Sequence, residues 1–401
     1  MYLMLAEMIF SVIQYFNLNR ILLLMIGLWP QKQTKLVRLQ IILCYFILTS
    51  FIVVQFMTFA TSKISLQLII DVFPAAFFFL SYMIKYSSFY FNRDVVKYLL
   101  DIVQHTYNEL KDESEIAIIK KHWNIARRYT KVLTIFSIFG VFGLISVPIL
   151  PHIIDVSWPA NKSRRCSSSQ ILTEYFIDQE KYFYLILVHM YAALYVGAAA
   201  MVSTGAMSVV YFQHVCGMFK VASYRIKQSM TNNVLQSDCL QKENLICKGI
   251  ICAVDMHRKA LKILELFLSK FNIFYFFLIP SAQISLSFSL FQVFNGVLSG
   301  YNIVRLISPC IYATVHYANV CVANSFAQKI TDYNSHIFVT VYNVKWYVAP
   351  LRTQKLILFL LQKGTKVFNL VVGGLFTASL EGLAVLTNAT LSYFIVIYSA
   401  G

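Results

Sequence analysis

Long apolar stretches are the feature of this sequence that most restricts how the chain can fold. A helix needs about 20 apolar residues to cross the roughly 30 Å hydrocarbon core of a membrane. The 401-residue chain is 58% hydrophobic and only 13% charged, whereas soluble domains are about a quarter charged. The sequence therefore predicts an all-α membrane protein with seven transmembrane helices, not an ordinary soluble enzyme. The seven spans lie at about residues 39–59, 67–91, 132–154, 182–212, 271–298, 303–325 and 370–398.

The distribution of basic residues predicts which face of the membrane each loop occupies. With seven spans, segments 1–38, 92–131, 213–270 and 326–369 share one face, and they hold most of the 34 Lys and Arg residues. Basic loops collect on the cytoplasmic side, so we expect a cytoplasmic N-terminus and an extracellular C-terminus. The same basic balance could indicate nucleic-acid binding, but basic loops flanking apolar spans indicate membrane lipid as the partner and no nucleic acid.

The spans and loops divide the chain into four regions. Residues 21–28 are apolar but too short to span the membrane, so they predict an interfacial helix. Apolar residues at helical spacing in 92–131 and 213–270 predict that spans two to six continue into the cytoplasm, where the helices pack together or join subunits. The regions are a cytoplasmic N-terminal segment (1–38), spans one to six (39–325), a cytoplasmic anchor segment (326–369) and the last span with a short extracellular end (370–401).

Motifs that would carry catalysis or metal binding do not occur in the sequence. The eight cysteines show no CxxC spacing and the eight histidines form no HExxH pair, which are the patterns of metal and redox sites. Phosphate-binding and dinucleotide glycine motifs are also lacking. We therefore expect no enzyme activity, no catalytic residue, no metal site and no cofactor. Asn161 begins an N-glycosylation sequon in the longest predicted extracellular segment.

The last span carries a stripe of polar residues. At 100° per residue, Thr377, Glu381, Asn388, Ser392 and Ser399 lie within about 60° of one another. Polar and ionisable groups are costly in lipid, so the stripe should face protein or water, and an ionisable residue within a span indicates a functional site. The alternative is that these residues only form hydrogen bonds with neighbouring helices.

Aromatic and small residues in spans two to four predict a ligand pocket. Tyr184, Tyr191 and Tyr195 follow at steps of seven and four residues, which places three phenols on one face of span four. Aromatic walls with a few hydroxyls suit a small hydrophobic ligand, although any single aromatic residue is more often ordinary packing. The candidate lining residues in these spans are Phe73, Phe77, Phe78, Gly143, Ser146, Tyr191 and Tyr195.

The last sixty residues carry several short motifs. They are Tyr342-Asn343-Val344-Lys345-Trp346-Tyr347 and residues 354–361, 374–381 and 391–394. Together these motifs resemble the C-terminal signature of insect odorant receptors. A further short motif at residues 27–30, before the first span, resembles one found in many of these receptors, notably those of Hymenoptera. The seven spans and the expected intracellular N-terminus extend the resemblance over the whole chain.

The resemblance implies a function and a set of partners. Such a chain would be a tuning subunit of a ligand-gated, non-selective cation channel in the plasma membrane of olfactory sensory neurons. It would form a heteromer, expected to be a tetramer, with the odorant receptor co-receptor. A volatile or hydrocarbon ligand would bind in the outer half of spans two, three, four and six, which adds Tyr312 of span six to the candidate lining residues. The cytoplasmic helices would hold the subunits together. The last span would line the pore, with pore and gate residues at Glu381, Asn388, Ser392, Val396 and Ala400.

Other membrane proteins with a similar number of spans are the alternatives. A G-protein-coupled receptor would have an extracellular N-terminus and usually an Asp-Arg-Tyr sequence at the inner end of span three. A gustatory-type receptor channel usually has Thr-Tyr and a downstream Gln-Phe in its last span, where this chain has Ser392-Tyr393 and Tyr398-Ser399. A transporter built from inverted repeats would show paired helix breaks in its two halves, and the prolines of this chain are not paired in that way.

Overall fold

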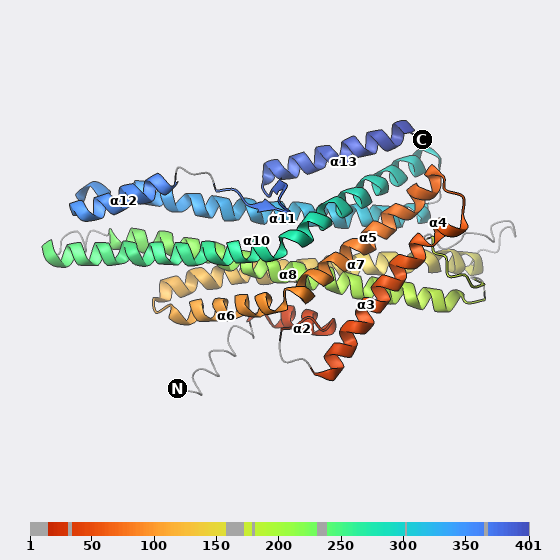
Figure 1. Ribbon diagram of the computed structural model, residues 1–401, viewed down its shortest axis with the longest axis horizontal. Coiled ribbons are helices and arrows are strands. Elements are labelled where there is room, and N and C mark those ends of the chain that lie inside the picture. The colour runs from red at the N-terminus through yellow and green to blue at the C-terminus, as the bar shows by residue number, and fades with distance from the viewer. Residues whose placement is uncertain are drawn as a thin grey trace.

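Long helices that run side by side make up almost the whole structure (Figure 1). The computed structural model describes residues 15–30, 34–157, 172–178, 181–230, 239–300, 303–364 and 368–400, so the sequon at Asn161 lies outside the described residues. A short 3-10 helix at Trp346–Val348 precedes α12. The helices are α2 (Asn17–Met25), α3 (Lys35–Phe56), α4 (Thr58–Thr61), α5 (Leu66–Phe91), α6 (Arg93–Glu109), α7 (Glu113–Ser157), α8 (Phe183–Ser229), α10 (Cys239–Leu298), α11 (Ile303–Asn343), α12 (Leu351–Gly364) and α13 (Leu380–Ala400).

Seven of these elements are long and apolar enough to cross a membrane, which confirms the predicted seven-span, all-α fold. They are α3 with α4, then α5, α7, α8, α10, α11 and α13. In Figure 1 the short α4 and the end of α13 lie at one end of the molecule, and α12 lies at the other. We refer to these as the α4 end and the α12 end.

Four of the helices extend far beyond the roughly 20 residues that a membrane requires. Helices α7, α8, α10 and α11 contain 45, 47, 60 and 41 residues, as expected for spans three to six. Span two behaves differently, because α5 ends at Phe91 and a separate α6 begins at Arg93. Between them the Asn92 side chain donates to the Ser88 carbonyl at 2.9 Å. Asn competes for backbone groups in this way, which favours a helix end.

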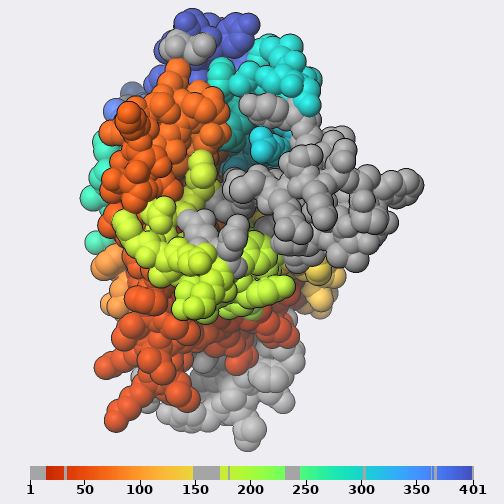
Figure 2. Space-filling model, turned by 90° about the vertical axis from the view of Figure 1, so that its right-hand side faces the viewer, coloured from red at the N-terminus to blue at the C-terminus, as the bar shows by residue number. Residues whose placement is uncertain are grey.

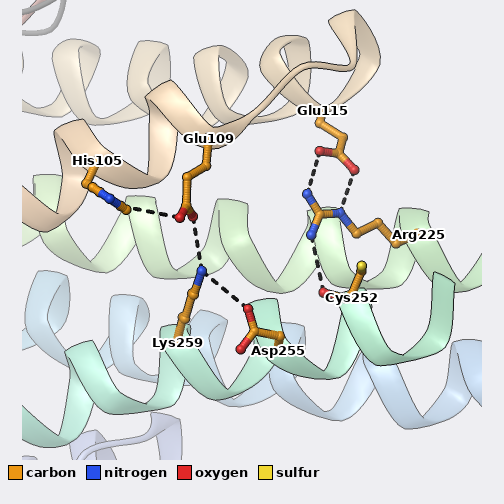
Figure 3. Close-up of polar contacts among 7 residues, drawn as sticks. All are labelled: His105, Glu109, Glu115, Arg225, Cys252, Asp255 and Lys259. Atoms are coloured by element: carbon orange, nitrogen blue, oxygen red, sulfur yellow. Dashed lines mark hydrogen bonds and ion pairs between the residues drawn. The ribbon is translucent and has the colours of Figure 1, made fainter. Parts of the chain in front are cut away.

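Ion pairs join the extended helices near the α12 end (Figure 3). Arg225 of α8 donates to both carboxylate oxygens of Glu115 of α7, at 2.6 and 2.7 Å. Lys259 of α10 pairs with Glu109 of α6 at 3.0 Å. The Arg225 guanidinium also donates to the Cys252 carbonyl of α10. These charged side chains connect α6, α7, α8 and α10. Hydropathy alone does not predict how these four helices lie relative to one another.

The short helix α2 corresponds to the predicted interfacial segment. Its Leu23 and the following Ile26 are fully buried, and the Tyr86 hydroxyl of α5 donates to the Ile26 carbonyl at 3.0 Å. On its other side Ile21 and Leu24 are exposed. The helix therefore packs one apolar face on the bundle and leaves a second apolar face uncovered.

The last span begins later than the sequence predicts. Residues 371–377 form a hairpin of β1 (Val371–Val372) and β2 (Phe376–Thr377), and α13 starts only at Leu380, not at residue 370. Gly373 and Gly374 adopt φ of +66° and +70°, a left-handed conformation that glycine adopts readily and that ends a helical path. Averaged hydropathy does not register such a turn, so the predicted span begins ten residues too early. Thr377 consequently lies in β2, outside the helix.

Candidate functional site

A small apolar cavity lies between α5, α7, α8 and α11. Its volume is about 50 Å³. Phe78 and Tyr82 of α5 form one wall, with ring centroids 4.6 Å apart, and Gly140 and Ile311 form part of another. We call this the Phe78 cavity. A Cβ atom at Gly197 of α8 would overlap the Tyr82 ring, so glycine there lets the ring lie directly against the α8 backbone.

Of the eight predicted pocket residues Phe78 lines this cavity, and four more lie beside its walls without lining it. Phe78 lines it and packs against Tyr312 with ring centroids 4.5 Å apart, and both side chains are buried. The half-buried Tyr191 packs against the same cluster and donates to the Ile145 carbonyl at 2.9 Å. The remaining two are Gly143, where an added Cβ would lie 2.7 Å from the Ile311 side chain, and Ser146, which donates to the Gly143 carbonyl at 2.7 Å.

Three predicted pocket residues lie elsewhere. The Phe73 ring packs against the Phe288 ring of α10, with centroids 5.3 Å apart, and against the Phe77 ring, with centroids 5.2 Å apart. Neither Phe73 nor Phe77 lines the Phe78 cavity. Tyr195 is 51% exposed on the surface of α8. The sequence prediction also missed Tyr82, Gly140 and Ile311. Gly140 stands three residues before Gly143, and this spacing of small residues on one helix face is a signal that could have identified it.

A polar vestibule lies toward the α4 end, which faces the viewer in Figure 2. Its volume is about 400 Å³, and Asp71, Gln292 and Arg305 are among its lining residues. Tyr312 also lines the vestibule while its ring contacts Phe78. The Tyr312 ring therefore lies between the polar vestibule and the apolar Phe78 cavity.

A second apolar cavity, larger than the Phe78 cavity, lies between α5, α8, α10, α11 and the β1–β2 hairpin. Its volume is about 180 Å³ and its walls are mostly apolar. We call it the Lys85 cavity, because the Lys85 side chain of α5 lines it and lies over the Tyr275 ring, 5.2 Å from the centroid. His316 and Asn324 of α11 are among its other polar lining residues.

Helix α13 lies against α10 and α11 with one face only (Figure 1). On the packed face Thr390 is buried, its hydroxyl donates to the Gln283 amide oxygen, and its carbonyl accepts from Ser287 at 3.3 Å. Only 11% of the most apolar stretch of α13 is buried, against 50% for α5 and α8.

The polar stripe lies on the uncovered face of α13. Glu381, Asn388, Ser392 and Ser399 are all exposed, and Val396 is exposed beside them. Ser392 donates to the carbonyl of Asn388 in its own helix. Glu381, predicted to lie within the last span, is in the first turn of α13, because the helix starts late. Ala400 is the last residue of the helix.

Helix α11 holds the start of α13 by hydrogen bonds. The backbone N–H of Ser379 donates to the side-chain oxygen of Asn324 at 3.1 Å, and that of Leu380 donates to Gln328 at 3.3 Å. The Ser379 hydroxyl then accepts from the backbone N–H of Gly382 at 2.9 Å, an N-cap that satisfies a free donor of the first turn. Asn324 and Gln328 of α11 thus contact the beginning of α13 directly.

Comparisons with known proteins agree with this architecture. The model of the family described as 7tm Odorant receptor matches residues 65–391. The structure is similar to that of the insect olfactory receptor OR5 from Machilis hrabei in complex with eugenol, with a TM-score of 0.80 and 15% identity over 98% of this chain and 100% of that chain. A second structure of the insect olfactory receptor OR5 from Machilis hrabei gives a TM-score of 0.79 and 16% identity over the same shares of the two chains. No curated protein matches the sequence.

Proposed function

Because the chain belongs to the 7tm odorant receptor family, we propose that it is an odorant-binding subunit of a cation channel. In this proposal a small hydrophobic ligand binds at the Phe78 cavity, and α13 lines a pore shared with the odorant receptor co-receptor. The observation that carries the proposal is the polar stripe on the uncovered face of α13. Polar side chains on a membrane helix need protein or water, and a pore formed by several subunits would supply both.

The ligand class follows from the walls of the Phe78 cavity. Aromatic and aliphatic side chains with few polar groups favour a ligand bound by shape and dispersion. At about 50 Å³ the cavity is small, so a ligand would have to widen it. Tyr312 is the residue between the cavity and the vestibule. A ligand changes an equilibrium only through its different affinity for two states, and a cavity that must widen provides such a difference. The Machilis hrabei receptor of similar fold was solved with eugenol, which belongs to this ligand class.

The membrane orientation is part of the proposal. The α12 end holds the basic extensions of α7, α8 and α10, and basic segments favour the cytoplasm. We therefore place the α12 end inside the cell, the α4 end and the vestibule outside, and the receptor in the plasma membrane of olfactory sensory neurons. The cytoplasmic extensions with α12 would join the subunits, because α12 presents exposed Leu358 and Phe359.

The ligand site is tested by filling the cavity. Gly140 faces open space apart from one Ile311 methyl at 3.9 Å, so Gly140→Val would place two methyl groups in the cavity without weakening the helix. Coexpressed with an insect co-receptor, the variant should need at least about tenfold more volatile ligand for half-maximal current. Currents driven by an agonist of the co-receptor should not change.

The matched control for this test is Ile138→Val, on the exposed side of the same helix, which should leave ligand sensitivity unchanged. Unaltered sensitivity in Gly140→Val would remove the Phe78 cavity from ligand binding. A response of the unmodified receptor that disappears when G proteins are blocked would instead favour a G-protein-coupled receptor. A current that needs no co-receptor would favour a gustatory-type channel.

A further inference from the structure

We propose that the Lys85 cavity is a second ligand site, next to the Phe78 cavity, that binds a small amphipathic carboxylate. The two cavities share Leu133, Met201, Gly205 and Asn319, but Lys85 and His316 line the Lys85 cavity and not the Phe78 cavity. The carboxylate would pair with the Lys85 ammonium and the hydrocarbon tail would fill the apolar part of the cavity. The binding step does not depend on the proposed channel function. Only its effect on the pore rests on that proposal.

Lys85 is a half-buried cation of the bundle for which the described residues supply no counter-ion. The ion pairs found among the described residues do not include it, and its one charge interaction is with the face of the Tyr275 ring. A desolvated ammonium is costly unless an anion or strong acceptor compensates it. An aromatic face supplies only a small part of that compensation. The cavity therefore has a position that favours a negatively charged ligand group.

A second polar group in the cavity, the His316 imidazole, has a ring nitrogen to which no described residue is hydrogen-bonded. His316 is 2% exposed, and its Nε2 atom has no hydrogen-bond partner among the residues that the structure describes. Buried polar atoms in proteins are almost always paired. A carboxylate or its bound water could satisfy Nε2, whereas a purely hydrocarbon ligand could not.

The rest of the wall fits a hydrocarbon tail of limited size. Leu264, Leu268 and Ile279 of α10 face Phe326 of α11 across the cavity. A volume of about 180 Å³ corresponds to roughly six waters at about 30 Å³ each. This space suits a single short acyl chain and is too small for a two-chain membrane lipid, so we commit to a free carboxylate such as octanoate.

The same cavity touches the beginning of α13. Val372 and Phe376 of the hairpin, Leu386 of α13 and Asn324 of α11 all line it. An occupant would contact the hairpin, the helix and the Asn324 side chain that holds Ser379. Binding there would therefore shift the balance between open and closed states in the proposed channel, as a modulator and not as the odorant.

The test measures equilibrium binding of labelled octanoate to the purified full-length chain in nanodiscs of phosphatidylcholine. Octanol is the matched probe without a charge. Lys85→Met keeps the hydrocarbon stem and removes the charge, and it should weaken octanoate binding by at least about tenfold, the loss expected for one charge-assisted hydrogen bond. Lys85→Arg should retain binding, and octanol binding should be the same in all three proteins.

Two further variants separate the two cavities. Ala282→Leu, at a buried position of the Lys85 cavity, should reduce octanoate binding by occupying its space. Gly140→Val should leave octanoate binding intact even where it abolishes the response to volatiles. Octanoate binding that survives Lys85→Met unchanged, or that is lost in Gly140→Val but not in Ala282→Leu, would overturn the proposal. So would binding that appears only when the nanodiscs contain an anionic phospholipid, because the head group of that lipid would then be the ligand.

Discussion

Asn324 shows how a single side chain connects two membrane helices. Its amide nitrogen donates to the Val320 carbonyl of its own helix, and its amide oxygen accepts from Ser379 before α13. The residue is buried, at 6% exposure. An amide is the side chain that can satisfy a carbonyl and an N–H at once, so no apolar residue of similar size could replace both bonds.

We expect Asn324→Leu to destabilise the start of α13 by about 1–3 kcal/mol, the usual cost of leaving a buried donor unpaired. Unfolding of the full chain in mixed detergent micelles would measure this loss. Asn324→Asp keeps an oxygen that can accept from Ser379 and should lose less stability than the leucine variant. Equal losses in the two variants would contradict the role assigned to this hydrogen bond.

Residue positions within the pocket could be predicted only in part. Helical spacing correctly grouped Tyr191 and Tyr195 on one side of α8, since four residues separate them by only about 40°. The boundary between the packed and exposed faces nevertheless falls between them, and Tyr195 lies on the exposed side. Periodicity gives the angle between two residues, but the rotation of the helix against its neighbours depends on packing that one sequence does not reveal.

At the scale of elements, the two faces of α13 differ in their surroundings. Thr390 is hydrogen-bonded to α10 on one side, while Asn388 and Ser392 are exposed on the other. The sequence alone identified the polar stripe. It did not identify the hairpin, because the Gly373-Gly374 turn lies in an otherwise apolar stretch.

Cysteine substitution along α13 would test which face lines the pore. In the complex with a co-receptor, Asn388→Cys and Ser392→Cys should react with a cationic thiol reagent, and the reaction should reduce the ligand-evoked current. Thr390→Cys faces α10 and should react at least about tenfold more slowly. Unmodified receptor gives the background from the native cysteines. Equal reaction rates at Asn388 and Thr390 would mean that the exposed face of α13 is not the water-filled one.

At the scale of the whole molecule, the extended helices at the α12 end depend on charge as well as on apolar packing. The Glu115 and Arg225 side chains are only 7% and 22% exposed and form a two-point contact, whereas Glu109 and Lys259 are each about 40% exposed. Figure 3 shows both pairs between neighbouring helices. Hydropathy predicted the lengths of these helices, but the pairing of particular charges could not be predicted because it depends on their relative register.

Removing one partner of each pair should therefore have unequal effects. Glu115→Gln leaves a mostly buried guanidinium without its carboxylate and should cost roughly 1–3 kcal/mol of unfolding free energy. Glu109→Gln breaks an exposed pair and should cost less than about 1 kcal/mol, with an effect that shrinks in high salt. Unfolding of both variants at low and high salt would measure the difference. Similar losses for both would show that burial of the Glu115 pair does not matter.

The Gly373 turn also sets the mechanics of α13. An added Cβ at Gly373 would lie 3.1 Å from the Phe276 backbone of α10, so the hairpin packs directly against that helix. The 21-residue α13 follows the hairpin and is about 30 Å long. A tilt of about 5° about the hairpin would move the far end of this helix by roughly 2.6 Å, taking its length from the rise per residue of an α-helix. Such a tilt would move Val396 and Ala400 much further than the hairpin, and it would have to change the contacts of Thr390 and Phe394 with α10.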